Sequence, residues 1–268
     1  MLEGSARVKS AAIGAIVGPM TMLACIGAAP GAAAAEVRVF CTGAPSVAVK
    51  AVAENFAKET GHRFSFTIGQ PATIQDLLAT GDKADVVIVP APVAAKLAAS
   101  GTVRADTIVE LAKVGVGVVV RAGAPLPDIS NAAAIRKLIV AARSIVYPDP
   151  TSGGGSAGRA IAHMIDRMGL TAAVRPKLTR NSAIGGGVAL VAAGKAEVGF
   201  FNISEIQPVP GVTLVGPLPA PLQSYIVFAA SIPVSNTTPE PAAAFIAALT
   251  APAAGEAWRK SGMEPAGH

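Results

Sequence analysis

The sequence predicts an α/β protein of two lobes, each a mostly parallel sheet flanked by helices. Short apolar runs alternate with stretches of helical periodicity, the pattern typical of parallel strands joined by helices. Residues 86–89 are uninterrupted Val and Ile, as in a strand buried on both faces. The alternation begins again at Asn131, with no repeat of fixed period. We therefore expect a second lobe inserted into the first.

The part of the chain before Asn131 contains four predicted strands and three predicted helices. A strand at residues 36–41 leads into a turn, and Ser46 is expected to cap a helix at residues 47–60 that ends at Gly61. Further strands are expected at residues 63–68, 84–89 and 114–121, with helices at 73–80 and 93–99.

The second half continues the same alternation. Helices are expected at residues 131–142, 157–168, 184–193, 239–249 and 252–260, and strands at 144–147, 196–201, 212–215 and 225–230. The strands near residues 114–120 and 225–230 are expected to cross between the lobes. The first lobe would then comprise residues 36–116 and 224–268, and the second residues 117–223.

Residues 1–35 have the features of a cleaved signal peptide. Arg7 and Lys9 precede a small and apolar stretch at residues 11–29, and alanines at 32–35 offer a cleavage site before Glu36. Glycines interrupt the apolar stretch, which suits a cleaved peptide better than a permanent span. Lipidation at Cys25 stays open as an alternative. We expect a mature chain that starts near Glu36 and is exported to the periplasm.

Composition excludes several classes of function. The formal charge of +5 falls to +4 when Arg7, Lys9 and Glu3 are removed, and aromatic residues make up only 4% of the chain, which argues against nucleic acid as a partner. A single cysteine, Cys41, remains after cleavage, so no internal disulfide can form, and we expect it to be a small core residue. Three histidines without ligand spacing argue against a metal, and nucleotide-binding motifs are missing. We expect a monomer without a cofactor.

A glycine-rich stretch follows the strand at residues 144–147 and leads into a helix. Its residues 151–156 read Thr-Ser-Gly-Gly-Gly-Ser, and Arg159 follows in the first helical turn. Glycines let a backbone approach a ligand closely, and the free N–H groups of a helix N-terminus attract anions. The order strand, glycine loop, helix favours an anion-facing loop over the alternative of a merely flexible one.

The carboxyl ends of the predicted strands carry short polar residues and glycines. In open α/β sheets ligands bind beyond these ends, so their joint placement predicts one cleft, although each turn alone is weak support. The predicted ligand-binding residues are Thr42, Gly43, Ala44, Gly69, Gln70, Ser152, Gly153, Gly154, Ser156, Arg159, Ile184 and Asn202.

Several stretches resemble the periplasmic type II solute-binding proteins of ABC transporters, in their molybdate-binding-like branch. The stretches are residues 39–40 with the following turn, 56–61, 84–88, 190–199 and 253–265. The resemblance covers nearly all of the mature chain. It implies two lobes that close over a small anion held by neutral donors and deliver it to a membrane permease.

The chain departs from this branch at the donors. Ala44 and Gln70 stand where the resemblance implies serines, and Asn202 stands where it implies a tyrosine. Residues 120–125, 203–212, 215–219 and 222–223 instead resemble a divergent subgroup that includes bacterial aconitate isomerase. That resemblance implies interconversion of trans- and cis-aconitate without a cofactor, and it transfers no catalytic residue to this chain.

A carboxylate ligand needs cations or several N–H donors in the cleft. Arg159 is the best placed cation, ahead of Arg121 and Arg180, and a solvated surface arginine is the alternative for each. Asp149 and Glu205 are the acid/base candidates for an allylic proton shift, although either could be a turn or capping residue. The histidines are weaker candidates: we expect His62 at the surface, a structural role for His163, and no role for the terminal His268.

The sequence therefore predicts an exported protein that closes over a small anion, a di- or tricarboxylate, with an ABC permease as its expected partner. An aconitate isomerase-like enzyme is the first alternative, and a molybdate or other oxyanion-binding protein is the second.

Overall fold

A computed structural model describes residues 1–4, 34–150, 155–181, 186–237 and 239–267. The chain divides into two units, Met1–Ala33 and Ala34–His268, and the described helices and strands belong to the second unit. Its strands are β1 (Glu36–Thr42), β2 (Arg63–Gly69), β3 (Val86–Pro90), β4 (Val109–Arg121), β5 (Ile145–Pro148), β6 (Leu178–Asn181), β7 (Val198–Asn202), β8 (Val212–Pro217), β9 (Tyr225–Ser231) and β10 (Glu264–Pro265).

These strands form one mixed sheet in two parallel groups. The order is β2-β1-β3-β9-β4-β7-β5-β6, and β8 and β10 each pair with β4. The pairs β1–β2, β1–β3, β5–β6 and β5–β7 are parallel, whereas β4 and β9 pair antiparallel with all their neighbours. Two parallel groups joined by antiparallel strands confirm the predicted class, an α/β fold of two lobes.

Strand β4 connects the two groups. Its first part pairs with β9, ending at Gly115 opposite Tyr225, and its second part pairs with β7, beginning at Val116 opposite Asn202. The switch of partner between two consecutive residues matches the expected crossing strand. The lobe boundaries at residues 116/117 and 223/224 remain a prediction.

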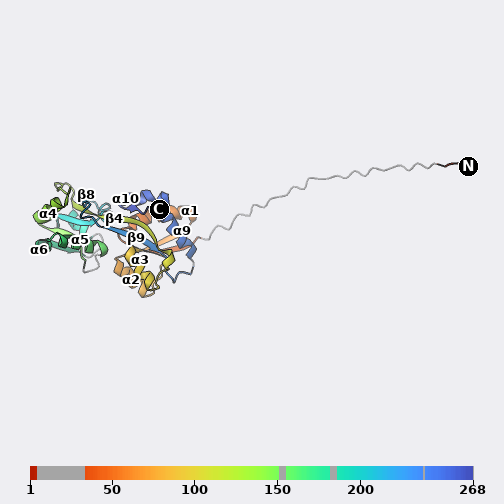
Figure 1. Cartoon of the computed structure of the whole chain (residues 1–268), viewed down its shortest axis with the longest axis horizontal. Helices are drawn as coiled ribbons and strands as arrows, with labels where there is room; N and C mark the ends of the chain where they lie inside the picture. Colours follow the sequence, from red (N-terminus) through yellow and green to blue (C-terminus); the bar gives the residue numbers. More distant parts are fainter. Residues whose placement is uncertain (5–33, 151–154, 182–185, 238, 268) are drawn as a thin grey trace. The chain divides into compact units, whose positions relative to one another are not determined.

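Helices cover both faces of the sheet (Figure 1). In the view of Figure 1, α4, α5 and α6 lie with β8 toward one end, and α1, α2, α3, α9 and α10 lie toward the other. The helices are α1 (Ser46–Thr60), α2 (Pro71–Ala79), α3 (Ala91–Ala99), α4 (Ala132–Ala141), α5 (Gly155–Arg167), α6 (Thr171–Val174), α7 (Gly186–Ala192), α8 (Ile203–Ile206), α9 (Pro239–Thr250) and α10 (Gly255–Lys260), with 3₁₀ turns η1 (Ala105–Thr107), η2 (Arg175–Lys177) and η3 (Pro252–Ala254).

The alternation of side chains along β4 supplies the cores on its two faces. Val118 packs in a buried cluster with Ile135 of α4, whereas Val119 packs in a separate cluster with Val188 of α7. Successive residues of a strand point to opposite faces, so an uninterrupted valine run can fill two cores at once. The apolar runs of the sequence therefore encode a sheet covered by helices on both sides.

Polar residues inside or beside the apolar runs explain where the predicted strand limits were wrong. Asp85 was expected within a strand, but β3 begins at Val86, and the Asp85 carboxylate accepts hydrogen bonds from the Arg38 backbone N–H at 2.8 Å and from its guanidinium at 3.0 Å. Strand β4 begins at Val109, five residues before the predicted start: Glu110 and Lys113 interrupt the apolar pattern, but residues 109–113 pair with β9.

Two local predictions were also wrong. Ser46 does not cap α1: Pro45 holds the N-cap position, and the Ser46 hydroxyl donates to the Gly43 carbonyl at 2.7 Å. His62 is buried rather than at the surface, since its Nδ1 accepts the Ala35 N–H at 3.1 Å and its ring lies 5.8 Å from the Phe56 ring. Cys41 is fully buried as expected, and this burial raises the pKa of its thiol.

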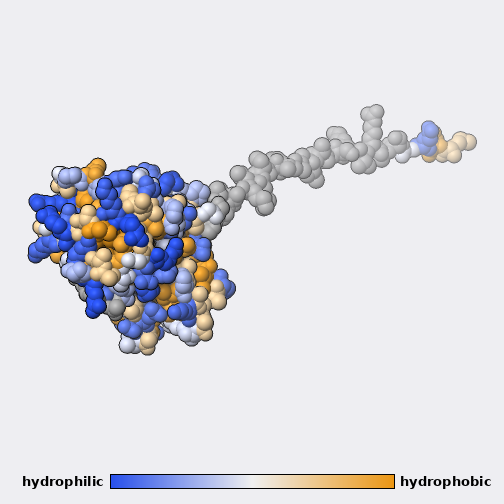
Figure 2. Space-filling view, turned by 60° about the vertical axis from the view of Figure 1, so that its left-hand side comes forward, coloured by the Kyte–Doolittle hydropathy of each residue, from blue (hydrophilic) through white to orange (hydrophobic). Residues whose placement is uncertain are grey.

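The surface of this unit has no continuous apolar face in the view of Figure 2, where hydrophobic patches are interrupted by hydrophilic residues. Large exposed hydrophobic side chains such as Leu126, Val140 and Val234 come from separate segments. Among the described residues, no helix is long and apolar enough to cross a membrane.

Candidate functional site

The carboxyl ends of β1 and β2 lie side by side, as predicted. Thr42 is opposite Gly69 in the parallel register, and Thr42 is buried with its hydroxyl 3.4 Å from the carbonyl oxygen of Ile88. Gly69 has little free space, because an added Cβ would lie 3.2 Å from the Thr73 Cβ. Gln70 is partly buried at the N-cap position of α2, and its side chain makes no capping hydrogen bond. An amide is therefore available at this edge.

The turn after β1 directs apolar rather than polar groups inward. The Ser46 N–H donates to the Gly43 carbonyl at 3.1 Å, which closes the turn onto α1. Ala44 is 4% exposed and packs in the hydrophobic cluster that contains Ala48 and Ile226. The predicted site residue Ala44 thus offers a methyl group and a backbone, and no side-chain donor.

Helix α5 begins next to the carboxyl end of β5. Asp149, just beyond β5, is buried, and an alanine Cβ at Gly158 would clash with the Pro148 carbonyl oxygen and lie 3.2 Å from the Pro150 nitrogen. The glycine lets the helix approach this loop, a requirement that the sequence did not reveal. Of the predicted loop residues, Ser152, Gly153 and Gly154 lie outside the described residues, as does Ile184.

The first turn of α5 also reaches the other lobe. Ala157 is buried in the same hydrophobic cluster as Ala44, while Ser156 beside it is partly buried. Arg159, the favoured cation, is exposed and has no ion pair with any described residue. The structure therefore brings the start of α5 toward the β1 side, with a cation that remains accessible to solvent.

Asn202 lies at the carboxyl end of β7 and is 4% exposed. It is the N-cap residue of α8, its side chain makes no capping hydrogen bond, and hydrogen bonding from its backbone and side chain lowers the pKa of Glu205. A glutamate three residues after the cap that reaches back to the cap N–H is one half of a capping box. The place of Glu205, three residues after the N-cap residue Asn202, fits the capping interpretation, and its acid/base role stays a prediction.

The surroundings of Glu205 also change its acidity. Burial raises the pKa of this carboxyl group to about 7, against the two hydrogen bonds from Asn202, which lower it. A carboxyl group that titrates near neutral pH can act as an acid or a base, so the capping role does not exclude a chemical one.

This pKa predicts how stability depends on pH. The Glu205 pKa is higher in the folded chain than its ordinary value of 4.5, so the folded state binds more protons between these two pH values. The free energy of unfolding should fall by about 1–3 kcal/mol as the pH rises from 4.5 to 7, and this loss should level off above pH 7.

Urea unfolding at a series of pH values measures this dependence. Glu205→Gln should remove the fall in unfolding free energy between pH 4.5 and 7. Glu256→Gln is the control and should retain this fall, because Lys260 lowers the pKa of the Glu256 carboxyl group. Parallel pH profiles for the wild type and Glu205→Gln would contradict the assignment.

Two oxygen atoms at this position have no hydrogen-bond partner among the described residues. They are the Asn202 side-chain oxygen Oδ1 and the Ser204 hydroxyl, and both residues are at most 4% exposed. Buried polar atoms are rarely left unpaired, because each costs about 1–3 kcal/mol of stability. This pair marks a place where a further partner is expected.

Gln223 is a positioning residue that the sequence did not identify beyond its place in the resemblance. Its Oε1 accepts the Val116 N–H at 2.8 Å and its Nε2 donates to the Val116 carbonyl at 3.0 Å. Val116 is the residue at which β4 changes partner and pairs with Asn202. One amide thus holds the crossing point of the lobes next to the candidate site, a contact over 107 residues that no local pattern signals.

Removing this amide should destabilise the chain. Gln223→Ala leaves the Val116 N–H without its side-chain acceptor, and we expect the free energy of unfolding to drop by about 1–3 kcal/mol. Urea denaturation measures the change, with Ser224→Ala at the exposed neighbour as the matched control. Equal midpoints for the two variants would show that the Gln223 contacts carry no stability.

The other arginine candidate with a described environment lies elsewhere. Arg121 ends β4, whose antiparallel pairing places Val120 opposite Val198 at the start of β7. Asn202 is at the other end of β7, so Arg121 lies at the opposite edge of the sheet from the candidate site. Arg180 is in β6, and its side chain is outside the description. Among the described residues, no group of three His, Cys, Asp or Glu could hold a metal ion.

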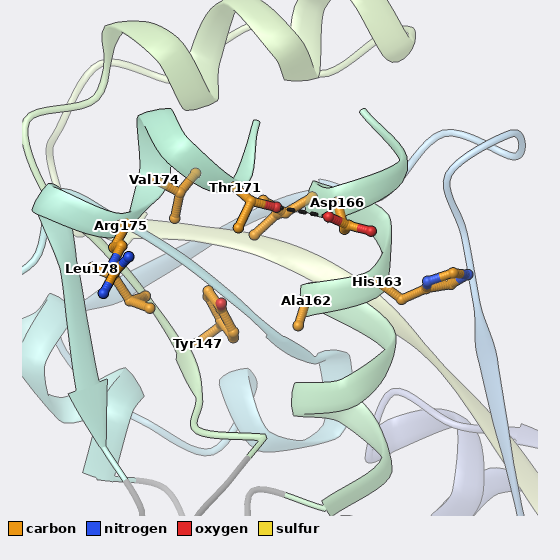
Figure 3. Close-up of a pocket in the computed structure, with 9 residues that line it drawn as sticks. Tyr147, Ala162, His163, Asp166, Thr171, Val174, Arg175 and Leu178 are labelled. Atoms are coloured by element: carbon orange, nitrogen blue, oxygen red, sulfur yellow. Dashed lines mark hydrogen bonds between the residues drawn. The ribbon is translucent and has the colours of Figure 1, made fainter. Parts of the chain in front are cut away.

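A separate cavity of about 530 Å³ lies between α5, α6 and the end of β5 (Figure 3). Tyr147 is at its centre in the view, and the Thr171 hydroxyl donates to Asp166 at 3.1 Å on its rim. His163 extends from the exposed side of α5, away from Tyr147. The α5 residues that line this cavity come from later turns than Ser156 and Arg159, and neither of those residues lines it, so it is not the predicted anion site.

The two-lobed sheet and the residues at its carboxyl edges define a type II periplasmic binding protein fold. Residues 37–264 match the family described as bacterial extracellular solute-binding proteins, and the chain belongs to this family.

Similar proteins carry several different names. An aconitate isomerase from a Pseudomonas species is 31% identical over 264 residues, which cover 97% of each chain. The periplasmic molybdate-binding protein of Azotobacter vinelandii has a TM-score of 0.72 at 19% identity, covering 85% of this chain and 98% of that one. The sulfate-binding protein SubI of Mycobacterium tuberculosis H37Rv has a TM-score of 0.69 at 20% identity, covering 86% and 87%. The two structures are similar to this chain in fold.

Proposed function

We propose that the chain is an exported solute-binding protein that closes over a small anion, a di- or tricarboxylate. The observation that carries this proposal is the likeness to an aconitate isomerase, which extends over 97% of both chains. That enzyme is named for a tricarboxylate, and the names of the structural relatives refer to the anions molybdate and sulfate. An anion is therefore the ligand class common to these relatives.

The candidate site supports an organic rather than an inorganic anion. Ala44 supplies a buried methyl group, and Asn202 supplies an amide at the other carboxyl edge. We expect the anion to be held by backbone N–H groups at the start of α5, by Thr42, Gly43, Gly69, Gln70 and Ser156, and by Arg159 at the entrance, together with the loop residues Ser152, Gly153, Gly154 and Ile184. Neutral donors at a helix N-terminus and one arginine together suit carboxylates.

Thermal unfolding with a set of anions tests this proposal. A ligand that binds the folded chain alone raises its melting temperature, by mass action. trans-Aconitate, citrate and succinate should raise the melting temperature of the mature chain more than molybdate or sulfate at equal concentration and pH. A shift with molybdate or sulfate alone would overturn the carboxylate proposal in favour of an oxyanion-binding protein.

The second candidate function is isomerisation of aconitate. It is favoured by the same relative and by Glu205, whose pKa near 7 suits a group that removes and returns a proton. Asp149, buried beyond β5, is the other acid/base candidate. Proton NMR of trans-aconitate in heavy water tests it: an isomerase would form the cis isomer and exchange the allylic proton. Binding without either change would leave the chain a binding protein.

Export and delivery are part of the same proposal. The family is one of extracellular proteins, and the sequence predicts a signal peptide at residues 1–35 and a mature, monomeric chain from Glu36. We expect an ABC permease as the partner if the ligand is released unchanged. Mass spectrometry of the chain secreted into a bacterial periplasm would establish the start of the mature protein.

A further inference from the structure

The Asn202 side chain uses its two ends unequally. Its oxygen Oδ1 has no partner among the described residues although Asn202 is 4% exposed, whereas hydrogen bonding from the same side chain lowers the pKa of Glu205. A carbonyl oxygen can only accept hydrogen bonds. The missing partner must therefore be a donor.

Glu205 fixes which end of the amide is free. Above pH 7, where Glu205 is ionised, a reversed Asn202 amide would place its oxygen against the carboxylate, and two acceptors would repel each other. With the orientation in the structure, hydrogen bonding from the Asn202 backbone and side chain lowers the pKa of the Glu205 carboxyl group. Glu205 thus holds Oδ1 in place as an acceptor, and Glu205 is in this respect a positioning residue.

The free oxygen lies at the edge of the sheet where the ligand is expected. Asn202 ends β7, is opposite Val116 at the crossing point of β4, and is on the strand next to β5, which leads to Asp149. A second unpaired group, the Ser204 hydroxyl, is two residues away and 3% exposed. Two buried and unpaired polar side chains at one strand end form a polar position prepared for a ligand or an ordered water.

We propose that the ligand presents a hydrogen-bond donor to Asn202 Oδ1, and that the protein thereby selects organic acids with a hydroxyl group or a carboxyl group that keeps its proton. This inference rests on the proposed carboxylate-binding function. A fully ionised anion without a hydroxyl group has only acceptors, so it would face Oδ1 with repulsion and leave the buried oxygen unpaired. Sites built to pair a ligand OH discriminate strongly against analogues that lack it, because the site's own polar group is then unsatisfied.

Citrate and tricarballylate are a matched pair of probes, since they differ only by the hydroxyl on the central carbon. If a hydroxyl is the donor, calorimetric titrations of the mature chain at pH 8, where Glu205 is ionised, should show that citrate binds at least tenfold more tightly than tricarballylate. If a protonated carboxyl is the donor, tricarballylate should instead bind at least tenfold more tightly at pH 6 than at pH 8. Glu205→Gln is the control for this second comparison. It keeps an acceptor oxygen for Asn202 but does not titrate, so a pH dependence that persists in this variant does not come from Glu205.

Asn202→Ala identifies the acceptor. In this variant, the affinity ratio of citrate to tricarballylate, or of tricarballylate at pH 6 to pH 8, should fall below twofold. The variant should still bind the probe that binds more weakly to the wild type. Ser204→Ala removes the neighbouring hydroxyl, which has no partner among the described residues. The logarithm of the same affinity ratio should keep at least half of its wild-type value in this variant. Melting curves of each variant confirm folding before titration.

Two results would overturn the inference and are distinguishable from each other. Equal binding of both probes at both pH values would show that an ordered water satisfies Oδ1, and the carboxylate-binding function would stand. Failure of every carboxylate to bind would end the proposed function and this inference together.

Discussion

Replacing Gly158 by alanine is expected to weaken anion binding at least tenfold and to lower the melting temperature. The added Cβ would clash with the Pro148 carbonyl oxygen and lie 3.2 Å from the Pro150 nitrogen. Both neighbours are backbone atoms, which cannot rotate away as a side chain can, so α5 and the loop after β5 must separate. Overpacking of this kind costs about 1–3 kcal/mol, and displacement of the helix N-terminus removes its N–H groups from the ligand.

Titration calorimetry with trans-aconitate and thermal unfolding measure the two effects of Gly158→Ala. Gly267→Ala is the matched control, since an added Cβ there meets nothing within 4 Å. Lower stability with unchanged affinity would show that the start of α5 does not contact the ligand. No change in either quantity would show that the loop after β5 adjusts freely.

Trp258→Ala should cause the largest loss of stability among these substitutions, about 3–5 kcal/mol. Trp258 of α10 is 1% exposed in the cluster that contains Phe245 and Val49, and its Nε1 donates to the Leu249 carbonyl at 2.9 Å. The substitution removes an indole ring and leaves a cavity between α10, α9 and α1. Urea denaturation of the mature chain measures the change.

Trp258→Phe separates packing from hydrogen bonding at the same position. It keeps an aromatic ring and removes the N–H, so it should cost about 1–3 kcal/mol, the penalty for an unpaired buried carbonyl with some loss of volume. If Trp258→Phe were as destabilising as Trp258→Ala, the hydrogen bond to Leu249 rather than the packing would dominate.

The parts of the fold that the sequence predicted are those with strong local patterns. The valine-rich run of β4 and the apolar β3 are buried on both faces, and such strands need no partner information to be recognised. Gly61 ends α1 with φ of +75°, a left-handed conformation that glycine favours, so this helix end was also readable.

The parts that the sequence did not predict depend on contacts between distant residues or on very short elements. Strand β6 and helix α8 have four residues each, too few for a hydrophobic period. His62 was placed at the surface because its acceptor role for the Ala35 N–H involves a residue 27 positions away. Gln223 holds Val116 over a still longer separation.

The candidate site shows the same division. The strand ends at Thr42 and Gly69 share one edge because β1 and β2 are parallel, whereas Asn202 ends β7 of the other group, antiparallel to β4 and opposite Val116 at the crossing point. The hydrogen bonds from Asn202 to Glu205 and the unpaired Oδ1 could not be inferred in this way, because they depend on side-chain orientation. The resemblance singled out Asn202 because it stands where a tyrosine is implied. The structure adds that its Oδ1 is buried without a partner among the described residues.

Calorimetric titration of the mature chain with trans-aconitate and, in parallel, with molybdate is the most direct test of the proposed carboxylate-binding function. A solute-binding protein for carboxylates should bind one trans-aconitate per chain with saturable heat and should bind molybdate at least tenfold more weakly. Tight binding of one molybdate per chain, with no heat from trans-aconitate, would contradict the proposal.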